Sequence, residues 1–220
     1  RAPRSAASGA VKVSGAGGEV NVKVEMFQPS ELTRESLQGF VEADGGVAIE
    51  AEHYTKKTDA GANRWIRIEG YGRTLSAMRT TSPVDASAAP GPGAPCLEYR
   101  MYLFAGGDVE VEATVGPTLN FVPGRGLRCA ISFDDEAPQV VTIVPADYSA
   151  QNGNRDWEES VRNNCRKVRS THKVERSGYH TLKIWMVDPG VALERIVVNR
   201  GGLKPSYLGP PESYRGGGKS

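Results

Sequence analysis

The chain has 220 residues, of which 39% are hydrophobic and 24% are charged, and its formal net charge is +1 at pH 7. These values are ordinary for a soluble protein with one sizeable domain, and the near-zero charge gives no indication of binding to nucleic acid or to an anionic membrane surface. No apolar run approaches the ~20 residues that span a bilayer. The 26 glycines and 14 prolines favour a fold with many strands and turns.

The N-terminal part of the chain predicts a hairpin that is separate from the main body. Residues 11–13 and 19–24 alternate between apolar and polar side chains around a glycine-rich turn. We therefore expect residues 1–27 to be the end of a preceding domain or a linker hairpin. Residues 28–215 are expected to form the main domain, and residues 216–220 a flexible tail.

Period-two alternation in the main domain predicts at least eight strands joined by short, turn-rich connections. In residues 180–186 the even-numbered side chains, from His180 to Met186, share one mostly apolar face. An antiparallel β-sandwich is the natural solution for so many strands, so the fold class is predicted to be mainly all-β. The strand segments are residues 47–54, 65–68, 74–80, 96–104, 108–115, 127–133, 139–144, 180–187 and 191–198.

A tight turn of sequence Asp-Pro-Gly at residues 188–190 separates the last two strands. Its proline fixes φ, and its glycine accepts the positive φ of a type II turn. After the turn, Val191, Leu193 and Val197 are expected to share one face. The two strands either pair as a hairpin or lie in different sheets of a sandwich, and the sequence leaves both arrangements open.

Two short helices are predicted among the strands. Ser30 is a suitable N-cap for a helix that ends near Leu37. The second helix is expected to begin at Asp156, because an acidic N-cap followed by Glu159 is typical of a capping box. Its apolar stripe consists of Trp157, Val161, Cys165 and Val168, and its last turn carries Arg166, Lys167 and Arg169.

The sequence contains no recognisable nucleophile, metalloprotease, phosphate-loop or dinucleotide motif. The three histidines are scattered, which favours structural roles for them. The run from Asp134 to Glu136 is the densest group of carboxylates, but neighbouring residues of a hairpin turn diverge, so we expect a solvated turn. The three cysteines fit no zinc-ligand spacing, and buried thiols are favoured over a disulfide. They are Cys96, Cys129 and Cys165.

Glu50 and Glu52 are expected to point to the same face of a strand, where two carboxylates ~7 Å apart repel unless a cation lies between them. One interpretation is cross-strand pairing with arginines. The other is a structural calcium site, because calcium takes hard oxygen ligands. Glu194 and Asp188 are suited to complete such a site from the region of the last strand.

Aromatic side chains suggest a place where a sugar ring could stack. Trp65 and Tyr71 lie near glycines and arginines and are the two candidates for this role, although core packing is the alternative for each. Arg73, together with Arg67 and Arg79, would favour an acidic sugar. The predicted carbohydrate contacts are therefore Trp65, Tyr71 and Arg73.

Five sequence strings in chain order carry a resemblance to a known family. They are GFVEADGGVAIEAEHYTKK (39–57), GRTLSAM (72–78), PTLNFVPGRGLRCAISFDDEAPQVV (117–141), HTLKIWMVDPGVALERIVV (180–198) and GGLKPSYLGPPES (201–213). Together they resemble the C-terminal region of glycoside hydrolase family 115, the xylan α-1,2-glucuronidases. The resemblance extends over about residues 20–213.

The first and fourth strings also resemble the first and last strands of jelly-roll carbohydrate-binding modules of families 6 and 35. In those modules, acidic residues near these strands bind a structural calcium ion. The resemblance therefore implies a calcium site at Glu50 and Glu52. Glu194 completes the set, at a position where an aspartate is commoner in those modules.

The resemblance implies an enzyme that removes glucuronic acid or its 4-O-methyl form from xylan, with its catalytic residues in more N-terminal domains that this chain lacks. The chain itself is then expected to be non-catalytic and to brace the catalytic domains or a homodimer interface. This hypothesis predicts an exposed apolar patch and suits the tail around Tyr207 and Leu208. The alternative is a module that binds xylan or glucuronoxylan in a shallow groove with an exposed aromatic. Because xylan lies outside the cell, a secreted or periplasmic location follows.

Overall fold

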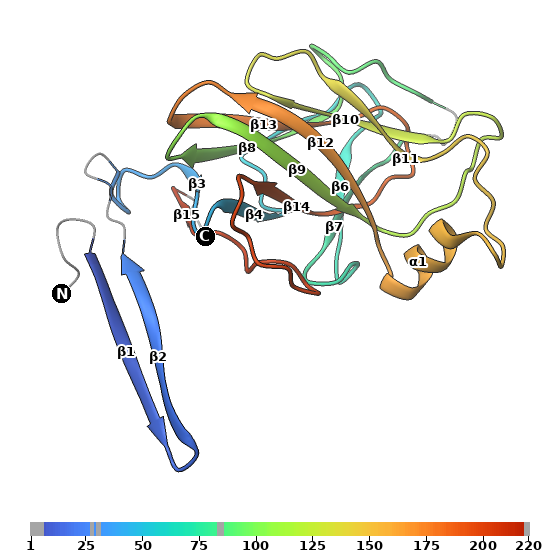
Figure 1. Cartoon of the computed structure of the whole chain (residues 1–220). Coiled ribbons are helices and arrows are strands. Elements are labelled where there is room, and N and C mark those ends of the chain that lie inside the picture. Colours follow the sequence, from blue (N-terminus) through green and yellow to red (C-terminus); the bar gives the residue numbers. More distant parts are fainter. Residues whose placement is uncertain (1–6, 27–28, 30–31, 83–85, 218–220) are drawn as a thin grey trace. The chain divides into compact units, whose positions relative to one another are not determined.

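The structure, a computed structural model, describes residues 7–26, 29, 32–82 and 86–217 (Figure 1). The chain divides into two compact units, residues 1–37 and residues 38–220. Within the described residues, no helix is long and apolar enough to cross a membrane.

The first unit contains the predicted hairpin, formed by the antiparallel strands β1 (Ala7–Gly15) and β2 (Gly18–Met26). The register places Val11 directly opposite Val22, so the two side chains lie on the same face of the hairpin. Because strand side chains alternate, Lys12 lies on the other face. The hairpin is therefore amphipathic, with one apolar face and one polar face.

The second unit consists of two sheets that lie face to face (Figure 1). The first sheet has the strand order β11-β10-β13-β8-β3-β15, with β5 also paired with β8. The second has the order β12-β9-β14-β7-β6, with β4 also paired with β14. Neighbouring strands are antiparallel, except that β3 runs parallel to β8. The predicted antiparallel β-sandwich is therefore confirmed.

The strands match most of the predicted segments closely. The early ones are β3 (Gly39–Val41), β4 (Gly46–Glu50), β5 (Lys56–Thr58), β6 (Trp65–Ile68) and β7 (Ala77–Thr80). The long central ones are β8 (Cys96–Leu103), β9 (Gly107–Val115), β10 (Leu127–Phe133) and β11 (Gln139–Val144). The last ones are β12 (Arg166–Val174), β13 (Gly178–Met186), β14 (Leu193–Asn199) and β15 (Arg215–Gly216).

The core lies between the two sheets. Strand β13 buries His180, Leu182, Ile184 and Met186, which is the predicted face. Each large apolar side chain that leaves water in this way contributes about 1.5–3 kcal/mol. The largest fully buried side chains include Phe40, Ile49, Leu97, Tyr99, Met101, Leu103, Leu127, Ile131, Leu182 and Ile196.

The Asp-Pro-Gly turn carries the chain from β13 in the first sheet to β14 in the second. The second of the two arrangements that the sequence left open is therefore the observed one. Gly190 has a φ of +94°, which agrees with its predicted role in the turn. A side chain at Gly190 would also meet the ring of Phe121, since an added Cβ would lie 2.6 Å from it.

The predicted helix that begins at Asp156 needs correction in its bounds. Helix α1 (Arg155–Asn163) begins after Asn154, not after Asp156, because the Asn154 side chain accepts hydrogen bonds from the backbone of the first turn. The helix ends at Asn164, which takes a left-handed conformation with φ of 51°. The predicted apolar stripe therefore stops before Cys165 and Val168, which lie outside the helix. Within the helix, Val161 is 55% exposed and does not face the core. The basic residues predicted for the last turn, Arg166, Lys167 and Arg169, lie on β12 instead.

The predicted short helix before Leu37 is also wrong, although its N-cap Ser30 lies outside the described residues. A turn replaces it, in which the Thr33 and Ser36 side chains each accept a hydrogen bond from the other residue's backbone. The three cysteines are free and buried, as favoured from the sequence. Burial raises the pKa of the Cys96 and Cys129 thiols to about 12, so both are poor nucleophiles.

Candidate functional site

Strand β14 carries an irregularity that shapes the polar region of the second sheet. Its pairing with β9 shifts between Leu193 and Arg195, so Glu194 is the extra residue of a bulge. Ile196 and Val198 then join Leu193 in the core, and the predicted face of Val191, Leu193 and Val197 is wrong beyond the bulge. Such a bulge redirects a side chain, here that of Glu194.

Glu194 is only 3% exposed, and its Oε1 has no hydrogen-bond partner within the described part of the chain. Burial raises the pKa of Glu194, and the nearby charge of Glu50 raises it further. The backbone and charge of Arg73 act in the opposite direction without cancelling the effect. Glu194 is therefore a buried carboxylate close to the carboxylate of Glu50, and one of its oxygens has no hydrogen-bond partner among the described residues.

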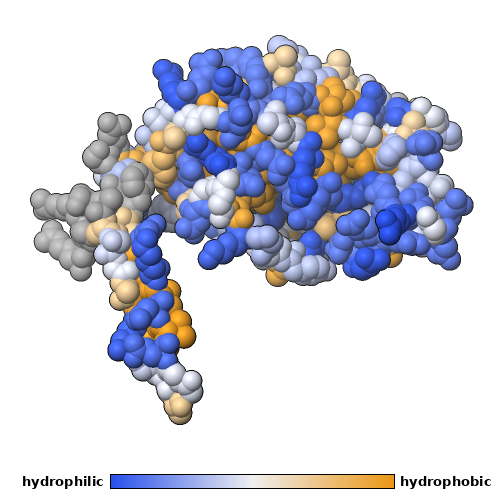
Figure 2. Space-filling model, viewed as in Figure 1, coloured by the Kyte–Doolittle hydropathy of each residue, from blue (hydrophilic) through white to orange (hydrophobic). Residues whose placement is uncertain are grey.

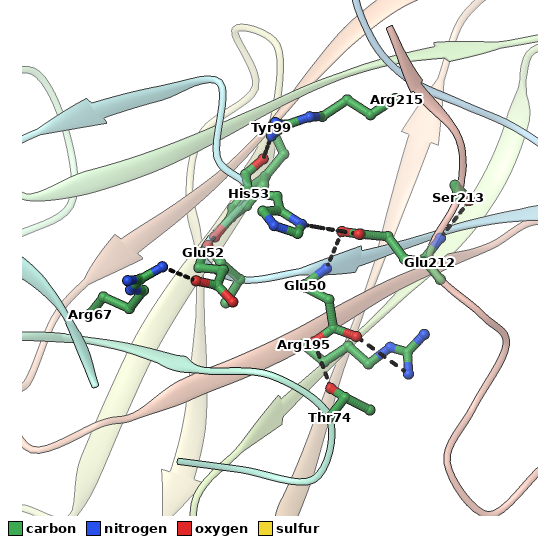
Figure 3. A network of polar contacts seen from close by, with 12 residues as sticks. Glu50, Glu52, His53, Arg67, Thr74, Tyr99, Arg195, Glu212, Ser213 and Arg215 are labelled. Atoms are coloured by element: carbon green, nitrogen blue, oxygen red, sulfur yellow. Dashed lines mark hydrogen bonds and ion pairs between the residues drawn. The ribbon is translucent and has the colours of Figure 1, made fainter. Parts of the chain in front are cut away.

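The predicted calcium ligands do not converge. Glu50 accepts a hydrogen bond from the Thr74 hydroxyl (2.6 Å) and lies 3.7 Å from Arg195, its cross-strand partner (Figure 3). Glu52 lies beyond the end of β4, not on a shared strand face with Glu50, and pairs with Arg67 at 2.8 Å. The arginine-pairing interpretation therefore describes both residues.

No three His, Cys, Asp or Glu side chains of the described residues are grouped so that they could hold a metal ion. Glu50 and Glu194 lie close enough to influence each other, but Glu52 is held away by Arg67. Glu50, Glu52 and Glu194 are therefore not grouped as a set of three carboxylates, and calcium binding stays a prediction.

Next to Glu50, side chains of the C-terminal segment (residues 203–217) form a clamp with β4 that the sequence did not reveal (Figure 3). The Glu212 carboxylate accepts hydrogen bonds from the Glu50 backbone (2.9 Å) and from His53 Nδ1 (2.8 Å). The Ser213 hydroxyl accepts one from the Ala48 backbone (3.0 Å). The strand β4 is thereby bonded to a segment more than 150 residues later, and the only sequence signal was a lone Glu-Ser pair among prolines and glycines.

An open cleft of about 400 Å³ lies between helix α1, the start of β12 and the C-terminal segment. Arg73 enters it from the loop before β7. Its guanidinium lies 4.2 Å above the centre of the Tyr207 ring and donates to the Tyr207 carbonyl (2.5 Å) and to Cys165 Sγ (3.4 Å). The lining is formed by Arg73, Asp156, Glu159, Ser160, Asn163, Cys165, Arg166, Lys167, Ser206 and Tyr207.

The three predicted carbohydrate contacts have different surroundings. Trp65 is 5% exposed and belongs to the core, so its ring faces no solvent, in line with the packing alternative. Tyr71 is 36% exposed and packs against the backbone at Gly116, where an added Cβ would lie 2.5 Å from its hydroxyl. Arg73 lines the cleft, but the exposed aromatic beside it is Tyr207, which is 69% exposed.

The acidic turn between β10 and β11 is not simply solvated, which corrects the sequence interpretation. Asp134 lies 2.7 Å from His180 Nδ1 on β13, and Glu136 pairs with His172 on β12. Because β13 and β12 belong to different sheets, the turn connects both layers of the sandwich. The prediction of structural roles for the histidines agrees with these contacts.

One of these contacts has the geometry of a nucleophile and its base. Ser170 Oγ lies 2.7 Å from His172 Nε2, and Glu136 contacts the other ring nitrogen. Acyl transfer also requires a substrate to reach the hydroxyl. Ser170 is 9% exposed and the His172 side chain is fully buried between strands, so a substrate from solvent does not reach this group.

Taken together, two stacked antiparallel sheets with a clamped C-terminal segment define a β-sandwich domain. Residues 39–212 match the family model described as the glycosyl hydrolase family 115 C-terminal domain. The chain therefore belongs to this family, as the sequence strings implied.

Solved structures include proteins that are similar to this chain. A family GH115 4-O-methyl-α-glucuronidase with specificity for decorated arabinogalactans is 20% identical, with a TM-score of 0.52, over 70% of this chain and 17% of that chain. A family 35 carbohydrate-binding module from Clostridium thermocellum is 14% identical, with a TM-score of 0.45, over 69% of this chain and 97% of that one. A comparison with curated proteins found no match. The first similarity shows a shared fold, and this chain spans only 17% of that glucuronidase.

Proposed function

We propose that the chain is a non-catalytic accessory domain of a family 115 glycoside hydrolase, and that it docks on the catalytic domains of that enzyme. The enzyme would remove glucuronic acid or 4-O-methylglucuronic acid from xylan. Membership of the C-terminal domain family supports the enzyme class. The observation that carries the docking role is the exposed apolar face of the β1–β2 hairpin.

This face is continuous and unusually apolar for a surface. Figure 2 shows hydrophobic atoms gathered along one side of the hairpin. A two-stranded hairpin is marginally stable alone in water, and a contiguous apolar surface marks an interaction site. The other face carries charged side chains, including the ion pair of Lys12 with Glu19 at 2.7 Å. The apolar face consists of Val11, Val13, Val20, Val22, Val24 and Met26, which are between 36% and 63% exposed.

We propose that the catalytic part of the same enzyme is the partner that covers this apolar face. The matched family is a C-terminal domain of a glycosyl hydrolase, and the similar glucuronidase is much longer than this chain. Burial of six apolar side chains against such a partner would remove them from water, at about 25 cal/mol for each Å². Since xylan is extracellular, we propose a secreted or periplasmic place of action.

The test mixes the 220-residue chain with the separately produced catalytic region of a family 115 glucuronidase and measures complex formation by light scattering after size exclusion. We expect the wild-type chain to form a complex. Val22→Lys should weaken it at least about tenfold, because a charge would enter an apolar interface. The matched control is Asn21→Lys on the polar face, which should bind like the wild type.

Equal binding by Val22→Lys and Asn21→Lys would overturn the docking role of this face. Self-association of the wild-type chain that Val22→Lys abolishes would instead assign the face to a homodimer. Release of glucuronic acid from glucuronoxylan by the chain alone would contradict the non-catalytic role.

Carbohydrate binding is the second candidate function, favoured by the open cleft and its exposed aromatic ring. Calorimetric titration with glucuronoxylan oligosaccharides, in calcium and again in EDTA, tests it. Heat that vanishes in EDTA would support a calcium-dependent module that uses Glu50 and Glu194. Heat that is unchanged in EDTA would support sugar binding without the metal, and no heat at millimolar ligand would remove this candidate.

A further inference from the structure

We propose that the cleft between helix α1, β12 and the C-terminal segment binds a pyranose unit of a polysaccharide, with the ring of Tyr207 as the stacking platform. This inference rests on the carbohydrate-binding candidate and not on the docking role of the hairpin. It moves the contact surface from Trp65 and Tyr71 to Tyr207, which the sequence pattern did not select for sugar binding.

The Tyr207 ring is presented as a flat and accessible surface. Arg73 covers one face at 4.2 Å, and the residue remains 69% exposed. A guanidinium stacked on an aromatic ring is attracted by the negative charge of the ring face. Arg73 therefore fixes the orientation of the ring and leaves the remaining surface for the C–H face of a sugar.

The segment that carries Tyr207 is held in place by buried groups. Arg195, which is 7% exposed, donates a hydrogen bond to the Leu208 carbonyl (2.8 Å) and another to the Pro210 carbonyl. Ser206 and Gly209 close a turn around Tyr207 through a backbone hydrogen bond of 3.2 Å. A platform ordered before binding saves the ordering entropy that a mobile aromatic would lose.

The polar lining of the cleft matches a ligand that carries both hydrogen-bond donors and acceptors. Lys167 has donors beyond its ion pair with Glu112, and Asp156 has acceptors beyond its ion pair with Arg166. Glu159 adds acceptors, and the Asn163 amide adds both kinds of group. Each hydroxyl of a pyranose can donate and accept. Adjacent hydroxyls can therefore use this mixed set, and the flat ring of Tyr207 takes the apolar face between them.

Other ligand classes fit the cleft less well. Two of the cations that line the cleft are already paired, Arg166 with Asp156 and Lys167 with Glu112, so the lining offers a phosphate or an acidic peptide little surplus positive charge. An apolar ligand would cover these polar groups without replacing their hydrogen bonds to water. The cleft volume of about 400 Å³ lies within the range typical of small-ligand sites, which is about 300–1,000 Å³.

Calorimetry on the full 220-residue chain tests the assignment with two probes, xylohexaose and a xylo-oligosaccharide that bears glucuronic acid. We expect binding of at least one probe, and Tyr207→Ala should weaken it about tenfold or more. The matched control is Tyr214→Ala, an exposed tyrosine of the same segment that does not line the cleft, which should bind within about twofold of the wild type. Asn163→Ala should weaken binding by a smaller factor.

The thermal unfolding midpoint of each variant verifies that the fold is retained. Absence of binding to both probes at about 10 mM would overturn the proposal, since it places any Kd above the millimolar range. Equal affinities of Tyr207→Ala and Tyr214→Ala would also overturn it. Complex formation with the catalytic region serves as a separate measurement, because Tyr207→Ala should leave docking through the hairpin unchanged.

Discussion

Asp188, the first residue of the turn between the sheets, is a fully buried carboxylate with its charge well compensated. It accepts hydrogen bonds from the Ser87 hydroxyl (2.6 Å) and from Arg128 Nε (2.8 Å), and Arg125 lies 3.4 Å away. Burial alone would raise the pKa of Asp188, but these hydrogen bonds and the charges of the two arginines outweigh burial and hold the pKa below its usual value. Asp188 therefore ties the turn to β10.

Replacing this carboxylate should cost stability in a pH-dependent way. We expect Asp188→Asn to lower the free energy of unfolding at pH 7 by about 2–3 kcal/mol, the value of charged hydrogen bonds. Because the folded-state pKa is depressed, this contribution is present above the unfolded pKa of about 3.9 and is lost as the pH falls through the folded value. Urea unfolding at pH 7 and at about pH 3 measures it, and the two proteins should differ less in acid.

Asp135→Asn is the matched control for Asp188→Asn, since it removes the same charge from a fully exposed side chain. Its effect should stay below about 0.5 kcal/mol. An equal loss of stability in both variants would contradict the special role of Asp188. So would an Asp188→Asn difference that persists unchanged at low pH.

Glu194 presents the opposite case, because its folded-state pKa is raised by burial. The folded state then binds the proton more tightly than the unfolded chain, so stability from this group falls as the pH rises above the unfolded pKa of about 4.3. We expect Glu194→Gln to raise the free energy of unfolding at pH 7 in EDTA by about 0.5–1 kcal/mol. The gain should shrink at about pH 5, where the wild-type carboxyl is closer to protonation.

The same variant tests the cation hypothesis. If calcium binds at Glu50 and Glu194, calcium stabilises the wild type by mass action, and Glu194→Gln abolishes that stabilisation. A loss of stability for Glu194→Gln in EDTA would contradict this prediction, because it would mean that the carboxylate stabilises the folded state.

At the scale of elements, the sequence predicts strands well where the inward face is apolar, and fails where it is polar. Strand β12 alternates perfectly between buried and exposed residues, but three of its inward side chains are Arg166, Ser170 and His172. Because these inward side chains are polar, the sequence shows no apolar alternation in this strand. Its basic residues were instead assigned to the last turn of the preceding helix. Helix α1 was predicted from its acidic start at Asp156, although the observed cap is Asn154 and the predicted apolar stripe extends past the end of the helix.

The candidate site was less predictable than the fold, for a physical reason. Arg73 was selected from its local neighbours, but its partner Tyr207 lies 134 residues later in the sequence. The clamp by Glu212 depends on a backbone N–H of Glu50 that no side-chain pattern reveals. The bulge that redirects Glu194 breaks the alternation without any glycine or proline to mark it.

The N-terminal cap of α1 offers a direct test at this scale. Asn154 Oδ1 accepts from the Asp156 backbone (3.1 Å), so Asn154→Ala should lower the free energy of unfolding by about 1 kcal/mol. Urea unfolding followed by circular dichroism measures the loss. Asn152→Ala, an exposed change two residues earlier, should stay near the wild type, and an equal effect of both variants would argue against the cap.

At the scale of the molecule, the two units should depend very differently on the rest of the chain. The hairpin strands are almost entirely exposed, whereas the sandwich has a core drawn from both sheets. The sandwich also depends on its own C-terminal segment, since Glu212 bonds to β4 and β15 pairs with β3. Removing the N-terminal hairpin should therefore affect stability much less than removing the C-terminal segment.

Deleting residues 1–28 removes the hairpin but retains the buried Leu37, and we expect the unfolding midpoint to stay within about 2 °C of the full chain. Deleting residues 203–220 should lower the free energy of unfolding by about 3 kcal/mol or more. The reason is that the buried Arg195 loses two carbonyl partners and β4 loses its bond to Glu212. Calorimetric unfolding of both deletions decides the matter. A large loss from the first deletion would mean that the hairpin is a structural part of the sandwich, and the docking role assigned to its apolar face would lose its basis.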